Sequence, residues 1–248
     1  MVVHCAPALF SLVQAQLVQI QLLAYNIGNS REFKSCPGKA DWVESENPVW
    51  EVLMRITLDN NCLISLKNKD GEYVESQALV DLHPDQITVY IPAIAASENQ
   101  QGTILHTNFA QFQEFLVEIG CEKYELLNPM IYLDISYFDH AIFADEQMES
   151  IERKIHEILF PNTPFLYAEY CKCFGLDPNN GVIDRKWRRA KCDVQAMWCH
   201  IHYNNDIFVT QDNNFHKTTK KGKLVALGAR EILRPRECLS KLKGVIKI

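Results

Sequence analysis

The sequence lacks the cysteine spacing of a structural zinc site. None of its nine cysteines forms a Cys-x-x-Cys pair, and only Cys171 and Cys173 lie close together. Structural zinc sites usually take ligands in closely spaced pairs. An odd number of scattered cysteines is also atypical of a disulfide framework. We therefore expect reduced, mostly buried thiols and a cytoplasmic location.

Charge is missing from the first 30 residues, which contain no Asp, Glu, Lys or Arg. A secretory signal would need a basic segment before its apolar stretch, and none is present. Glutamines interrupt the apolar run, which argues against a signal peptide and against a membrane span: Gln14, Gln16, Gln19 and Gln21. Residues 14–25 are better explained as one or two strands. We predict a β-rich N-terminal extension over residues 1–48 and a main domain over residues 49–248.

Positive charge is scarce overall. The chain has 248 residues and a formal net charge of -6, with ordinary hydrophobic and charged contents of 47% and 23%. A nucleic-acid-binding protein with this balance must concentrate its basic residues locally. Residues 184–223 show such a concentration, with nine Lys or Arg opposed by four Asp.

Apolar patterning predicts that strands alternate with helices. Strands are predicted at 52–58, 87–91, 207–210 and 224–232, and helices after Pro92, at 107–119, 145–160 and 184–202, and after Pro235. Residues 130–138 fit either a strand or an irregular apolar segment, and residues 174–182 form a loop. This alternation is typical of an α/β fold with three α/β/α layers and a central parallel sheet.

Acidic residues stand near the carboxyl ends of the predicted strands. Asp59 ends an apolar strand, Asp212 follows another by two residues, and Asp193 lies on the helix that leads into that second strand. In open parallel sheets this edge is where ligands bind. A buried carboxylate is costly unless it is compensated, and a divalent cation such as Mg²⁺ or Mn²⁺ compensates several of them at once.

These segments resemble the PIN-domain family of metal-dependent nucleases. Residues 56–64 are similar to the family's first strand, where Asp59 would be the leading metal ligand and Asn61 a supporting residue. The stretch Ile91-Pro-Ala-Ile-Ala-Ala-Ser-Glu98 is similar to the helix that presents the second acid, Glu98.

The strongest single match is the run Asp206-Ile-Phe-Val-Thr-Gln-Asp212-Asn-Asn-Phe215. There Thr210 looks like the family's strand-end hydroxyl, Asp212 like the fourth acid, and Asp193 before it like the third. The tail from Leu227 to Glu237 resembles the last strand and the helix after it. Roughly residues 50–240 are covered, in four ordered blocks.

The resemblance implies a divalent-metal-dependent endoribonuclease with a PIN-like fold and no membrane association. Its catalytic residues and metal ligands would be Asp59, Glu98, Asp193 and Asp212, holding Mg²⁺ or Mn²⁺. Two features depart from the family pattern. Asn60 stands where members often have Thr or Ser, and the long interval between Glu98 and Asp193 implies a helical insertion within 102–183.

The basic cluster is predicted to bind phosphates of a single-stranded or structured RNA. The residues expected to do so are Arg185, Lys186, Arg188, Arg189, Lys217, Lys220 and Lys221, together with Trp187. Trp187 fits two roles, packing in the core or stacking on an unpaired base.

Each acid also has a structural explanation. Asp59 suits a turn, Asp212 a helix cap, Glu98 an exposed helix position, and Asp193 an ion pair with Arg189 one turn earlier. Asp134 follows another apolar run and is an alternative leading acid.

Two other functions are also compatible with the sequence. One is a PIN-like module that binds nucleic acid or protein without turnover, and the other is a related phosphatase or DNA nuclease. Toxin-type family members would imply a protein inhibitor or antitoxin as partner, whereas others process RNA within larger assemblies. The sequence also leaves homo-oligomerisation open.

Overall fold

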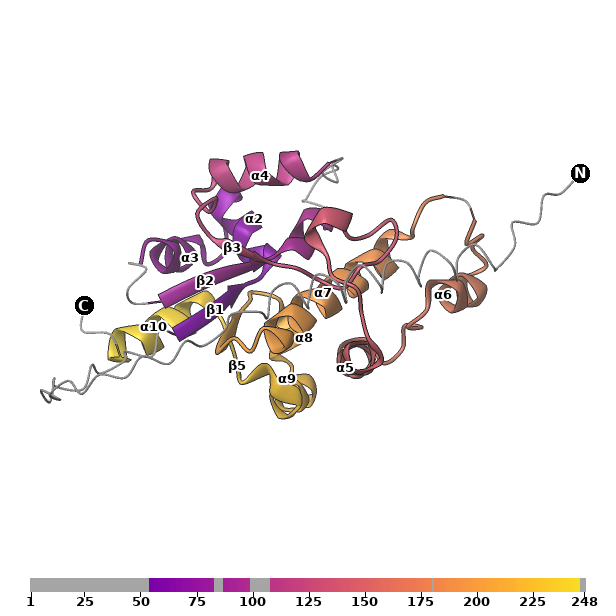
Figure 1. Ribbon diagram of the computed structural model, residues 1–248. Coiled ribbons are helices and arrows are strands. Elements are labelled where there is room, and N and C mark those ends of the chain that lie inside the picture. Colours follow the sequence, from indigo (N-terminus) through magenta and orange to yellow (C-terminus); the bar gives the residue numbers. More distant parts are fainter. Residues whose placement is uncertain (1–53, 83–86, 99–107, 180, 246–248) are drawn as a thin grey trace, which may run out of the picture. The chain divides into compact units, whose positions relative to one another are not determined.

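The computed structural model describes residues 54–82, 87–98, 108–179 and 181–245 (Figure 1). All of them belong to one compact unit, Glu51–Ile248. The extension predicted at residues 1–48 lies outside the described residues. Among the helices of the described ranges, none is long and apolar enough to cross a membrane.

Five short strands, all parallel, form one sheet in the order β3-β2-β1-β4-β5. The central strand β1 (Met54–Leu58) lies between β2 (Ile87–Pro92) and β4 (Ile207–Val209), and β3 (Glu125–Leu127) and β5 (Glu231–Leu233) form the edges. The chain runs outward from β1 to β3 and then returns to the other side of β1 with β4. This reversal opens a crevice between the carboxyl ends of β1 and β4, where open α/β sheets bind ligands.

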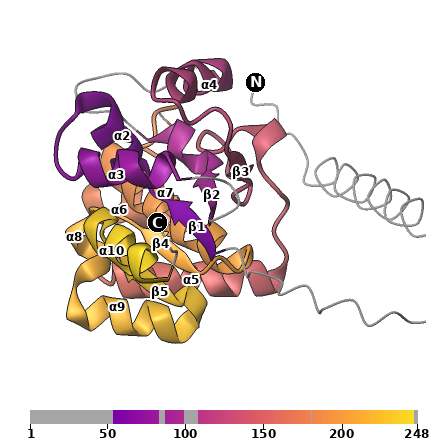
Figure 2. The ribbon, with the colours of Figure 1, turned by 90° about the vertical axis from the view of Figure 1, so that its left-hand side faces the viewer.

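Side chains that alternate along the strands enter two separate cores. Ile56, Val89 and Val209 lie in one core, which also contains residues of four helices: α2 (Asn60–Asn68), α3 (Tyr73–Val80), α4 (Phe109–Glu118) and α10 (Pro235–Val245). Phe208 and Ile232 lie in the other core, with residues of α5 (Glu146–Leu159) and α7 (Arg185–His202). Figure 2 shows α2 and α4 on one side of the strands and α5 on the other. The predicted α/β fold with a parallel sheet is confirmed, and the arrangement is consistent with three layers.

The helices with the clearest amphipathic pattern are where the sequence predicts them. α4, α5 and α7 match the ranges 107–119, 145–160 and 184–202. Side-chain caps explain where all three start, and Asn108 caps α4 by accepting from the Gln111 amide. The Asp145 carboxylate accepts from the Met148 amide at the start of α5, and that of Asp184 accepts from the Lys186 and Trp187 amides at the start of α7.

The strand predicted at 224–232 is wrong over most of its length. Residues Thr218–Leu224 form α9, Val225–Ala229 form the π-helical turn η3, and only β5 is a strand. Leu224 and Ala229 are buried in the core beside α7. The apolar residues of this run therefore form the buried side of a helical segment. Gly228, at φ +119°, makes a non-helical kink within this turn.

Other segments differ from expectation in smaller ways. Pro92 ends β2, and the helix after it is the 3₁₀ turn η1 (Ala93–Ser97). Residues 130–137 are irregular, with one bridge from Met130 to Ile142, and the 3₁₀ turn η2 (Phe138–His140) begins at the last residue of the predicted segment. The range 102–183 supplies the edge strand β3 as well as helices, including the unpredicted α6 (Tyr167–Phe174).

Candidate active site

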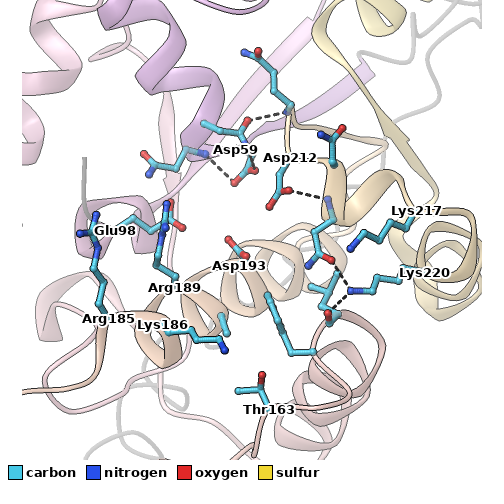
Figure 3. A pocket seen from close by; sticks show the side chains of 18 of the residues that line it. Asp59, Glu98, Thr163, Arg185, Lys186, Arg189, Asp193, Asp212, Lys217 and Lys220 are labelled. Atoms are coloured by element: carbon cyan, nitrogen blue, oxygen red, sulfur yellow. Dashed lines mark hydrogen bonds between the residues drawn. The ribbon is translucent and has the colours of Figure 1, made fainter. Parts of the chain in front are cut away.

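Four carboxylates from distant parts of the sequence line one pocket of about 1520 Å³. Asp59 follows β1, Glu98 follows η1, Asp193 lies within α7, and Asp212 precedes α8 (Asn213–His216) (Figure 3). Asp59 and Asp212 come from the two strands that flank the crevice of the sheet, which is why they meet. The structure thus places all four acids predicted as metal ligands around one cavity.

Asp59 is held by hydrogen bonds on both carboxylate oxygens. Its Oδ1 accepts from the Asn60 amide at 2.9 Å. Its Oδ2 accepts from Asn61 Nδ2 and from the Thr210 hydroxyl, both at 2.7 Å. The residue is only 5% exposed, so these donors fix its orientation and offset part of the cost of burial.

Asn61 and Thr210, predicted as supporting residues, join the ends of β1 and β4. Thr210 Oγ1 accepts from Asn61 Nδ2 at 2.9 Å and from the Asp212 amide at 3.0 Å. Asn61 Oδ1 accepts from the Gln211 amide at 2.8 Å. Asp212 also accepts from the Asn214 amide at 2.8 Å, so it caps α8 while it lines the pocket.

The carboxylates raise one another's pKa. Burial, and then the charge of Asp212, raises the pKa of Asp59 to about 6 against its hydrogen bonds. Burial and the charge of Asp59 raise the pKa of Glu98 to about 8. Burial, together with the charges of Glu98, Asp59 and Asp212, holds the pKa of Asp193 well above its usual range. Such a site resists full ionisation until a cation enters it.

The donor chemistry suits a hard divalent cation. Carboxylate oxygens are the ligands that Mg²⁺ and Mn²⁺ prefer, and a cation would reverse the repulsion that raises these pKa values. In the part of the chain that the structure describes, no group of three or more His, Cys, Asp or Glu side chains has the geometry to hold a metal ion. The four carboxylates are the right type of ligand for such a cation. To bind it, their side chains would have to move closer together.

Basic side chains stand on two sides of the acids. Arg185 and Arg189 rise from α7 beside Glu98, and Lys217 and Lys220 lie on the opposite side (Figure 3). Lys186 also lines the pocket. Lys186, Arg189 and Asp193 follow the i, i+3, i+7 spacing of one helix face, which explains why they meet.

Two of these basic residues have partners that define their roles. The charge of Arg189 offsets part of the rise in the pKa of Glu98, and no ion pair joins Arg189 to Asp193 among the described residues. The Lys220 ammonium donates to the Leu159 carbonyl and to Asn214 Oδ1, so it ties the end of α5 to α8. The main role of Lys220 is therefore structural, and it is less suited than its neighbours to contact phosphate.

Three predicted substrate-binding residues do not lie in the pocket. Trp187 is 4% exposed, its indole N–H donates to the Pro164 carbonyl at 3.0 Å, and its ring packs against Tyr167. Of the two roles that the sequence left open for Trp187, the structure shows packing in the core, so its assignment to substrate binding is wrong. Arg188 and Lys221 are absent from the pocket lining. Neighbouring helix residues point in different directions, so a basic run cannot place every member on one face.

The structure also brings residues to the pocket that the sequence did not indicate. Gln211 lines it between Thr210 and Asp212, and Asn162 and Thr163 line it from the loop after α5. Pro161 marked the end of that helix, but no local pattern placed the loop beside the acids. Asp134, the alternative leading acid, is exposed and does not line the pocket.

Comparisons with protein-family models, with curated proteins and with solved structures find no match. The resemblance to PIN domains therefore remains a prediction from the residues, and the site has to be interpreted from its own geometry.

Proposed function

We propose that this chain is a PIN-like, divalent-metal-dependent endoribonuclease. The supporting observation is that Asp59, Glu98, Asp193 and Asp212 line one pocket whose opposite sides carry basic residues. An acidic centre with basic flanks suits a polyanion whose central phosphate must approach carboxylates. Cation binding at the centre removes the repulsion that such an approach would otherwise meet.

The residues divide into three roles under this proposal. The four carboxylates would hold Mg²⁺ or Mn²⁺, which when bound supplies a water of lowered pKa and offsets charge on the phosphodiester. Asn61 and Thr210 keep Asp59 turned towards the pocket through the hydrogen bonds described above. Phosphates of the RNA are contacted by exposed basic residues of the lining: Arg185, Lys186, Arg189 and Lys217.

Cleavage of a labelled single-stranded RNA tests the proposal. The protein is assayed with Mn²⁺, with EDTA and as the Asp212→Asn variant, and Asp134→Asn serves as a matched control because Asp134 is exposed outside the pocket. We expect cleavage only with Mn²⁺, its loss in Asp212→Asn and its retention in Asp134→Asn. Equal cleavage by the parent and Asp212→Asn would refute the assignment of the site.

A second candidate function is a module that binds RNA or protein without turnover. It is favoured by one observation, that the described side chains do not form a ready metal-holding group. RNA binding that is independent of Mn²⁺, with no cleavage under any metal condition, would support this alternative. Parallel assays on duplex DNA and on a small phosphomonoester separate the nuclease proposal from a DNA nuclease and from a phosphatase.

A further inference from the structure

A column of aromatic side chains leads from the core beside α7 to the surface. The ring of Trp187 lies 5.0 Å from that of Tyr167, Tyr167 lies 6.3 Å from Tyr170, and Tyr170 lies 4.5 Å from Phe174. Trp187 and Tyr170 are 4% and 3% exposed, whereas Phe174 at the outer end is 54% exposed. The column therefore ends in one open aromatic ring on a packed base.

Hydrogen bonds tie this column to the start of α7. The Tyr170 hydroxyl donates to Asp184 Oδ1 at 2.8 Å, and the Asp184 amide donates to the Tyr167 hydroxyl at 3.0 Å. The same Asp184 carboxylate caps α7. The exposed ring is consequently held in a fixed position relative to the helix that contributes Arg185, Lys186 and Arg189 to the pocket.

Lys186 links the exposed ring to the pocket. Its ammonium lies 5.8 Å from the centre of the Phe174 ring, and its side chain lines the pocket. Asp193 follows seven residues later on the same helix face, about 10 Å along the helix axis. A strand with one phosphate at the acids and another near Lys186 would thus bring a neighbouring base towards Phe174.

We propose that Phe174 is a stacking platform for an unpaired nucleobase next to the cleavage site, with Lys186 contacting the adjoining phosphate. The inference rests on the proposed nuclease function and narrows its substrate to strands with an unpaired base at this position. The adjacent positive charge favours a nucleic acid over an apolar peptide as the occupant. Bases in a duplex already stack on their neighbours, so only an unpaired base can use the ring.

Binding and cleavage of a labelled single-stranded RNA by the full chain test this role. The variants are Phe174→Ala, Phe174→Trp, and Leu166→Ala as a control for loss of a similarly exposed apolar side chain, 48% exposed, at the other end of α6. Base–aromatic stacking predicts about 5- to 100-fold weaker RNA binding for Phe174→Ala. Phe174→Trp should bind at least as well as the parent, and Leu166→Ala should match it.

A scan with abasic RNAs distinguishes base stacking on Phe174 from a purely structural role of this residue. At one position, removal of the base should weaken binding to the parent, and Phe174→Ala should add no further loss there. Equal binding by Phe174→Ala and the parent, a loss that persists on every abasic RNA, or an equal loss on duplex RNA would overturn the platform. If the parent cleaves RNA with Mn²⁺, each of these results leaves the nuclease proposal standing. A parent that neither binds nor cleaves RNA overturns both.

Discussion

The hydroxyl of Thr210 donates a 2.7 Å hydrogen bond to the carboxylate of Asp59, a residue 151 positions earlier in the chain. The same oxygen accepts from the side-chain amide of Asn61 and from the backbone amide of Asp212. One buried hydroxyl therefore makes three hydrogen bonds and joins the carboxyl ends of β1 and β4. It therefore links the backbone of Asp212 to the side chain of Asp59, and both residues are candidate metal ligands.

Replacing Thr210 with Val tests this junction with little change in side-chain size. The variant would leave Asp59 without one donor and the Asp212 amide without its acceptor, so we expect a loss of about 1–3 kcal/mol in the free energy of unfolding. Metal-dependent cleavage should fall by roughly 10- to 100-fold because the ligand is no longer oriented. Urea denaturation and kcat/KM measure the two effects. Thr210→Ser keeps the hydroxyl and should retain most of both properties, and identical behaviour of the Val and Ser variants would contradict the role.

The raised pKa of Glu98 predicts a pH-dependent gain in stability for Glu98→Gln without metal. The folded protein holds a proton on Glu98 up to about pH 8, whereas the pKa of an ordinary Glu side chain is 4.5. Stability of the parent should therefore fall as pH rises through this window, because the folded state binds the proton more tightly. At pH 8 in EDTA we expect Glu98→Gln to be more stable than the parent by about 1.4 kcal/mol or more.

Urea denaturation of the parent and Glu98→Gln at pH 5 and pH 8 tests this predicted pH dependence of the stability difference. The advantage of the variant should shrink towards pH 5, where both proteins are neutral at position 98. Asp134→Asn, with its side chain exposed, is the control and should show no such trend. A Glu98→Gln variant that is less stable than the parent at pH 8 would show that Glu98 is not repelled by its neighbours.

The buried ion pair between Lys191 and Glu152 should be costly to break from one side. The two side chains are 1% and 0% exposed and lie 2.9 Å apart, and Glu152 also accepts from Gln195 and Tyr132. Lys191→Met would leave a buried carboxylate without its cation, so we expect a loss of about 3–5 kcal/mol. Adding Glu152→Gln to this variant should recover much of the lost stability. Strictly additive effects in urea denaturation would argue against a coupled pair.

Gly71 leaves room for the side chain of Gln211, which lines the pocket. A Cβ at Gly71 would lie 2.5 Å from Gln211 Oε1, which accepts from the Glu72 amide at 3.0 Å. Gly71→Ala should displace Gln211 and lower RNA cleavage, besides costing about 1 kcal/mol for its positive φ. Gly120 is the matched control, because its φ is +70° but nothing lies within 4 Å of its added Cβ. Gly120→Ala should cost similar stability and leave cleavage unchanged, and equal cleavage by both variants would contradict the contact.

Local pattern was sufficient to predict several elements and failed where it was ambiguous. The apolar strands β1, β2 and β4 and the amphipathic helices α4, α5 and α7 lie where periodicity placed them. The run at 224–229 suited a strand as well as a buried helix face, and only packing against α7 decided between them. Trp187 was equally ambiguous, and its burial depends on Tyr167, twenty positions earlier in a helix that was not predicted.

By itself the sequence determined the alternation of strands and helices, and it set Asp59 and Asp212 just beyond strands. These features are local, since they depend on side-chain periodicity and on turn chemistry. Only the tertiary structure decided the strand order that puts β4 beside β1 and so brings Asp59, Glu98, Asp193 and Asp212 to one pocket. It also decided that Trp187 is buried and Phe174 is open. These outcomes depend on contacts between residues far apart in the chain, which no local pattern encodes.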